Sequence, residues 1–163
     1  MFERQLTVYA FLLNYARRLV ADIDDARFAD QSSPEVNHPA WLLGHLAIST
    51  DLAALLLKKR TACPKAWHKL FGPGTAALPD RSLYPAKEEL VRALEDGHSR
   101  VIEAIGKADP GSLAEPHALP IDDFATSLPT KADFLTHLLT SHEAGHLGHL
   151  SNWRRQMGMP YLF

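Results

Sequence analysis

Nine histidines occur in this chain of 163 residues, and two of them have a spacing that suits metal coordination. His142 and His146 are four residues apart, so on a helix of about 100° per residue they lie one turn apart on the same face. Neutral imidazole is a good ligand for divalent zinc, nickel, copper or iron, and such a pair can hold one ion from a single helix. The pair alone is equally compatible with hydrogen-bonded core histidines.

A third histidine shifts the balance towards a metal site. His45 shares an apolar stripe with Ile48 and Leu52, so it is expected to point inward from a second helix. Three ligands from two facing helices leave coordination positions open, whereas a structural zinc site is usually closed by four protein ligands. The sequence therefore predicts an open site that holds one divalent ion through His45, His142 and His146.

Further residues around these three were considered for supporting roles. His149 continues the predicted inward register of the last helix, and His98 lies on an apolar stripe between neighbouring leucine and valine positions. We expect His149 to act as a second-shell partner or fourth ligand. His98 is expected to be a buried histidine satisfied by a carbonyl group or water, with a second-shell role in the same cavity as the alternative. Gly44 and Gly145 precede two of the ligands and are expected to allow close approach of a neighbour.

Other titratable groups are expected to lie off the metal face. Glu143 is about 100° from His142 on a helix, so it is predicted to face solvent rather than to serve as a general base. His137 is about 140° from His142 and is expected to leave the same face. His68 and His117 fall in predicted loops and receive no role.

Four amphipathic stretches must position the histidines. Apolar residues recur at spacings of three and four over residues 2–25, 39–60, 85–105 and 130–157, the period of helices that bury one face. Residues 61–85 and 109–129 are rich in proline and read as long loops. The pattern predicts an all-α protein, a four-helix bundle with long connecting loops, formed as a single domain over residues 1–163.

Composition excludes several classes of partner. The formal charge of -2 gives no broad positive field for nucleic acid or anionic lipid. The sequence also contains no continuous apolar run of about 18 residues, the length that would predict a membrane span. The N-terminus lacks a secretory pattern, and Cys63 is the only cysteine. We therefore expect a cytoplasmic protein that binds neither nucleic acid nor membrane.

Two segments resemble the signatures of a known family. Residues 37–46 read Asn-His-Pro-Ala-Trp-Leu-Leu-Gly-His-Leu and residues 141–150 read Ser-His-Glu-Ala-Gly-His-Leu-Gly-His-Leu. Both are similar to the motifs of the DinB-like superfamily, the damage-inducible metal-binding four-helix bundles. The resemblance implies that His45, His142 and His146 bind a divalent metal, most often nickel or zinc. His149 stands where many members have glutamine, which leaves the coordination number open.

The resemblance also implies a class of reaction. Related proteins include transferases and isomerases that use a low-molecular-weight thiol such as bacillithiol, mycothiol or glutathione. A metal with a free position can activate such a thiol towards an electrophile. We expect a thiol S-transferase or isomerase acting on a small-molecule substrate, with hydrolysis less favoured and a homodimer as the assembly. The alternative is a non-catalytic metal-binding stress or sensor protein.

Overall fold

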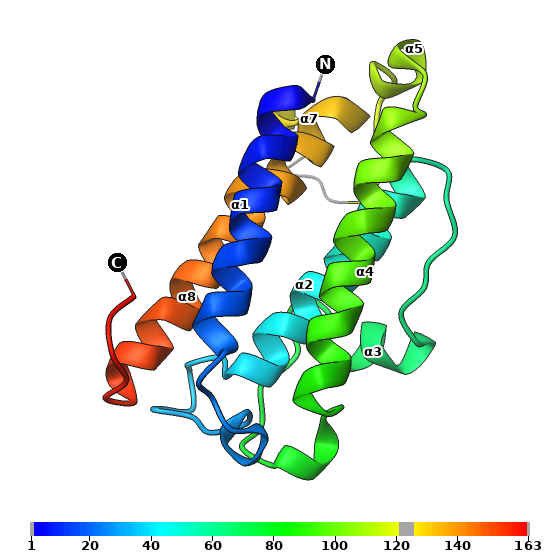
Figure 1. Cartoon of the computed structure of the whole chain (residues 1–163). Helices are drawn as coiled ribbons and strands as arrows, with labels where there is room; N and C mark the ends of the chain where they lie inside the picture. Colours follow the sequence, from blue (N-terminus) through cyan, green and yellow to red (C-terminus); the bar gives the residue numbers. More distant parts are fainter. Residues whose placement is uncertain (1, 121–125, 163) are drawn as a thin grey trace.

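Four long helical rods form the protein, and a computed structural model describes residues 2–120 and 126–162. The first three rods are α1 (Glu3–Val20), α2 (Pro39–Leu56) and α4 (Lys87–Gly106). The fourth is continuous and consists of α7 (Lys131–His137), the π-helical turn η3 (Leu138–His142) and α8 (Glu143–Gln156). The rods lie side by side (Figure 1). The described residues contain no strand, which confirms the predicted all-α bundle.

Short helical segments interrupt the connections. These are η1 (Asp25–Arg27), α3 (Lys65–Leu70), η2 (Arg81–Leu83) and α5 (Pro110–Leu113). The predicted loop 61–85 thus contains α3 and η2, while part of the predicted loop 109–129 lies outside the described residues. The first helix ends at Val20, five residues before the predicted end. Ile23 fits the apolar pattern of the helix although it lies after the helix end, because its side chain is buried there.

Helix α2 is the central rod. His38 caps its N-terminus, because its Nδ1 accepts the backbone N–H of Trp41, and Pro39 occupies the first turn. By length and composition α2 would pass for a membrane span, with mean hydropathy 1.3, but 83% of that window is buried inside the bundle. Such burial is typical of the core helix of a bundle, which is apolar on all sides.

The contact between α2 and α4 depends on a glycine. A methyl group placed at Gly97 on α4 would overlap the side chain of Thr50 on α2, so the absence of a side chain lets the two helices approach closely. The apolar core then fills both ends of the bundle, from Leu42 and Trp153 at one end to Val101 and Leu135 at the other.

The π-helical turn η3 changes the register of the fourth rod. A capping box between Thr130 and Asp133 starts α7. The turn Leu138–His142 then accommodates an extra residue per turn. Beyond it, the buried residues include Glu143, Leu147, Leu150 and Trp153.

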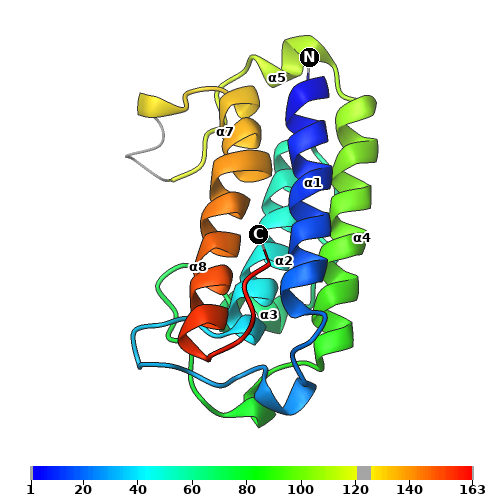
Figure 2. The same ribbon diagram turned by 60° about the vertical axis from the view of Figure 1, so that its left-hand side comes forward.

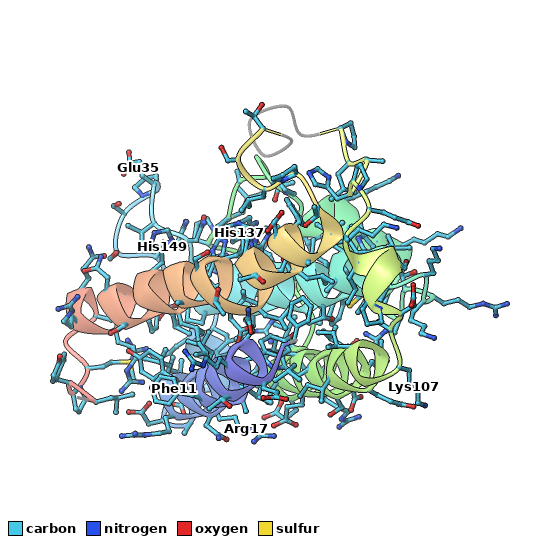
Figure 3. The ribbon with its side chains drawn as sticks, turned by 90° about the horizontal axis from the view of Figure 1, so that it is seen from above. Phe11, Arg17, Glu35, Lys107, His137 and His149 are labelled. Atoms are coloured by element: carbon cyan, nitrogen blue, oxygen red, sulfur yellow. The ribbon has the colours of Figure 1, made fainter. Side chains whose placement is uncertain are left out.

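The burial pattern of α8 corrects two predictions. Gly145 and His149 were expected to face inward, but both are exposed. Figure 2 shows that α7 and α8 nevertheless form one continuous rod beside α1 and α2. Viewed from above, His137 and His149 lie on the side of this rod that faces away from α1 (Figure 3).

Candidate metal centre

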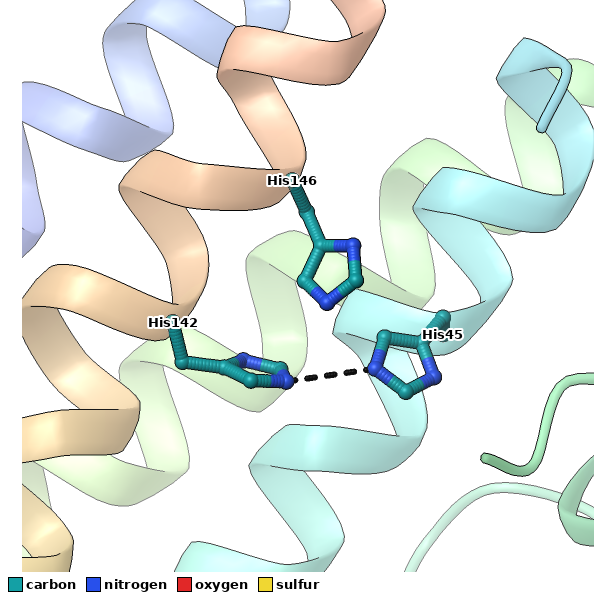
Figure 4. Close-up of side chains that lie close together, drawn as sticks. All are labelled: His45, His142 and His146. Carbon is teal, nitrogen blue, oxygen red and sulfur yellow. Dashed lines mark hydrogen bonds between the residues drawn. The ribbon is translucent and has the colours of Figure 1, made fainter. Parts of the chain in front are cut away.

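Three histidine side chains from two rods meet between α2 and α8. His45 extends from α2, His142 is the last residue of η3, and His146 lies one turn further along α8. One potential ligand atom from each residue lies within 4.8 Å of the other two. The three rings converge on one point, with Nε2 of His45 only 3.2 Å from Nε2 of His142 (Figure 4).

This separation fits two ligands of one ion. Nitrogen atoms bound to zinc at ~2.1 Å are about 3.4 Å apart at a tetrahedral angle and about 3.0 Å apart at a right angle. The observed distance between the Nε2 atoms of His45 and His142 lies between these values. Two imidazole nitrogens this close must share either a proton or a cation, because two bare lone pairs would repel each other. The donor set therefore fits a divalent metal.

The fold fixes His45 more firmly than its partners. Its Nδ1–H donates a hydrogen bond of 2.8 Å to the backbone carbonyl of Phe71, which leaves the lone pair on Nε2 for a ligand bond. The indole of Trp41 stacks on the ring with 4.8 Å between centroids and 7° between planes. The Nδ1 atoms of His142 and His146 are buried and have no hydrogen-bond partner in the described structure.

The two glycines beside the ligands differ. A methyl group at Gly44 would overlap the ring of Phe71, so the close approach predicted at Gly44 is confirmed. It also brings the carbonyl of Phe71 within reach of His45. A methyl group at Gly145 would meet nothing within 4 Å, so the same prediction for Gly145 is wrong.

Burial keeps the three imidazoles neutral. It lowers the pKa of His142 to about 4 and that of His146 to about 3, with the neighbouring imidazoles as a smaller cause. Burial also lowers the pKa of His45, although the hydrogen bond to Phe71 opposes the shift. Since a metal ligand must be deprotonated, the site is ready to bind a cation at neutral pH.

A cavity of about 450 Å³ opens onto two of the three histidines, a volume within the usual range of small-molecule sites. Its walls are largely apolar, and its polar groups besides His45 and His142 are Ser49 and His68. The remaining lining residues are Ile48, Leu52, Leu55, Gly72, Pro73, Phe134 and Leu138. A small molecule in this cavity would reach the edge of the three-histidine cluster.

The two additional histidines occupy different places. His149 is exposed, and its ring centroid is 5.8 Å from that of His146, with the rings nearly perpendicular. His98 is buried on α4, where it stacks on Tyr9 with 3.6 Å between centroids. Its Nε2 lies 3.1 Å from Oε1 of Glu143. A carboxylate thus takes the place of the carbonyl group or water expected beside His98, and His98 does not line the cavity.

The prediction that Glu143 faces solvent is wrong. Its side chain is buried against His98 of α4, because α8 is buried along the face of Glu143 and Leu147 as well as facing the histidine cluster, and burial raises the pKa of its carboxyl group. Residues 142–146 have the His-Glu-x-x-His spacing of zinc peptidases, so spacing does not exclude that class. The position of Glu143 argues against it, because the carboxylate contacts His98 and does not line the cavity.

Two other histidines lie closer to the cluster or the cavity than sequence spacing indicates. His137 lies near His142, with 5.6 Å between ring centroids, because a π-helical turn brings residues five apart closer to one face than an α-helix does. His68 was assigned to a loop without a role, yet it lies on α3 and lines the cavity. Local sequence carries no signal for this, since the position of α3 depends on tertiary contacts.

Comparison with known proteins identifies the family of the chain. The model of the DinB superfamily matches residues 10–150, a range that includes His45, His142 and His146. A search of curated proteins found no match.

Proposed function

The chain belongs to the DinB superfamily, and we propose that it is an enzyme that uses one divalent metal ion held by His45, His142 and His146. The observation that carries the proposal is the convergence of three neutral imidazoles at the edge of an apolar cavity. Only three protein ligands meet there among the described residues, which favours an open coordination sphere. Nickel and zinc are the ions that imidazole ligands and the family resemblance favour.

We propose that the reaction is a thiol transfer or a thiol-dependent isomerisation of a small electrophile. A bound divalent ion would supply a Lewis acid that favours the ionised form of a thiol. The chain's own residues hold the ion, and the walls formed by Ile48, Leu52 and Phe134 surround the apolar part of the substrate and exclude water.

The thiol in this proposal comes from outside the chain. Cys63 is the only cysteine and does not line the cavity. Burial and the nearby carboxylate of Asp51 raise the pKa of its thiol to about 12, so it is a poor nucleophile at neutral pH. A low-molecular-weight thiol as cosubstrate is consistent with these observations.

The alternative is a metal-binding stress or sensor protein without turnover. Such a role needs no access for a small molecule, so the cavity beside His45 and His142 favours the enzyme. Hydrolysis is less favoured, because the family resemblance implies thiol chemistry and no carboxylate lines the cavity among the residues that the structure describes.

Cobalt substitution tests the thiol part of the proposal. Addition of 2-mercaptoethanol or glutathione to the cobalt-loaded protein should produce a sulfur-to-cobalt charge-transfer band in the near ultraviolet. Ethylene glycol serves as the matched control, because it has a hydroxyl group in place of the thiol and should give no band. If none of the thiols changes the spectrum of the cobalt protein, the thiol-dependent reaction is wrong although the metal site stands.

A further inference from the structure

A fully buried carboxylate lies behind the cavity wall. Asp51 on α2 accepts the backbone N–H groups of Ala62 and Cys63 at 2.8 and 2.9 Å, and Nη2 of Arg100 on α4 lies 3.3 Å from its Oδ1. Its Oδ2 lies 3.3 Å from Nε2 of His68 on α3. The backbone contacts hold the carboxylate in place, so it can orient the imidazole.

His68 combines this buried partner with access to the cavity. Its side chain is 40% exposed and lines the same cavity as His45 and His142. The helix that carries it is anchored by the buried rings of Trp67 and Phe71. Because the carbonyl of Phe71 also orients His45, one short segment positions both a candidate metal ligand and a second imidazole at the cavity.

We propose that His68 accepts the proton of the thiol that binds beside the metal, with Asp51 as its positioning residue. The inference rests on the function proposed above. When Nε2–H points to Asp51, the lone pair of His68 lies on Nδ1. The S–H bond of the thiol breaks, its electron pair stays on sulfur, and the proton forms a new N–H bond at Nδ1. The carboxylate of Asp51 then stabilises the imidazolium ion, as in other carboxylate–histidine pairs.

A purely structural role for the Asp51–His68 contact is the competing explanation. The loop after α2 is already fixed by the bonds from Ala62 and Cys63 to Asp51, and a contact to a half-exposed histidine adds little stability. A structural role would leave the number of protons released on thiol binding unchanged. Proton transfer to His68 would change that number, so the two explanations differ in a measurable quantity.

Calorimetry on the zinc-loaded protein counts these protons. Titration with 2-mercaptoethanol at pH 7 in two buffers of different ionisation enthalpy gives the number of protons released per thiol bound. The thiol is protonated in solution at this pH. Wild type should retain the proton on His68, whereas His68→Gln should release about one more proton per thiol to the buffer. Lys69→Gln is the matched control, because it alters an exposed residue of α3 that does not line the cavity, and should behave as wild type.

The outcomes separate this inference from the function on which it rests. Asp51→Asn, which removes the charge behind His68, should shift proton release in the same direction as His68→Gln. Equal proton release by wild type and His68→Gln, with thiol bound by both, would overturn the role of His68 and leave the proposed function intact. If zinc-loaded wild type binds no thiol, the thiol-dependent function is wrong and the role of His68 is wrong with it.

Discussion

Gly44→Ala is expected to disturb both packing and the metal centre. The added methyl group would overlap the ring of Phe71. That ring is fully buried and is held between Trp67 and Tyr84, at centroid distances of 5.6 and 5.9 Å. It therefore has little room to move, and overpacking of a core costs ~1–3 kcal/mol. Alanine regains about 1 kcal/mol of helix propensity over glycine, so we expect a net loss of up to about 2 kcal/mol in the free energy of unfolding.

The same change should weaken metal binding through the backbone. When the ring of Phe71 is displaced, its carbonyl moves from the position where it accepts Nδ1–H of His45. Loss of such an outer partner of a ligand lowers metal affinity ~10–100-fold. Urea unfolding of the metal-free protein measures the stability change, and competition with a zinc chelator measures the affinity.

Gly145→Ala provides the matched control. It is the same substitution beside another candidate ligand, but the new methyl group would meet nothing within 4 Å. It should stabilise the protein by ~0.5–1 kcal/mol and leave zinc affinity unchanged. If Gly44→Ala is as stable as Gly145→Ala, the ring of Phe71 can make room for the methyl group and the predicted overpacking is wrong. If Gly44→Ala is less stable but binds zinc as wild type does, Phe71 does not position His45.

Three further changes test other parts of the fold. Burial lowers the pKa of His38 from 6.5 to about 4, so the unfolded chain binds a proton that the folded chain does not, and the free energy of unfolding should fall as pH drops through this window. In His38→Asn, which keeps a capping side chain, urea unfolding at pH 7 and pH 5 should show a smaller fall. Glu143→Ala leaves His98 buried without its carboxylate. It should lower the free energy of unfolding, measured by thermal unfolding, by about 3 kcal/mol, and Glu143→Gln should lower it by less. Equal losses in the two variants would contradict this role of Glu143. Gly97→Ala, which would overlap Thr50, should lower the free energy of unfolding in urea by up to about 2 kcal/mol, the overpacking cost less the gain in helix propensity. A variant stabilised by the full ~1 kcal/mol of helix propensity would contradict the close α2–α4 contact.

The helical architecture and the cluster of three histidines were predictable from periodicity. The stripe that carries His45 and the four-residue spacing of His142 and His146 depend only on regular helix geometry. The structure brings these three side chains together, and metal binding itself stays a prediction. The three residues could therefore be chosen from the sequence without knowledge of the long-range packing.

The burial of a second face of the fourth rod marks the limit of that reasoning. Reasoning from His142 at a constant angle per residue placed His149 inside and Glu143 outside, whereas the structure has the reverse, because α8 is also buried along the face of Glu143 and Leu147. A π-helical turn depends on how the rod packs against its neighbours, and it has no simple sequence signature. His68 was missed for a related reason, because its partner Asp51 is 17 residues away on another helix.

Metal content tests the central claim most directly. Wild type, His146→Ala and the exposed-site control His149→Ala should be purified without an affinity tag, supplied with zinc or nickel, dialysed and analysed by plasma mass spectrometry. We predict about one ion per chain in wild type and in His149→Ala, and a clear loss of bound metal in His146→Ala. Wild type without stoichiometric metal after supplementation, or His146→Ala with the same content as wild type, would contradict a metal centre formed by His45, His142 and His146.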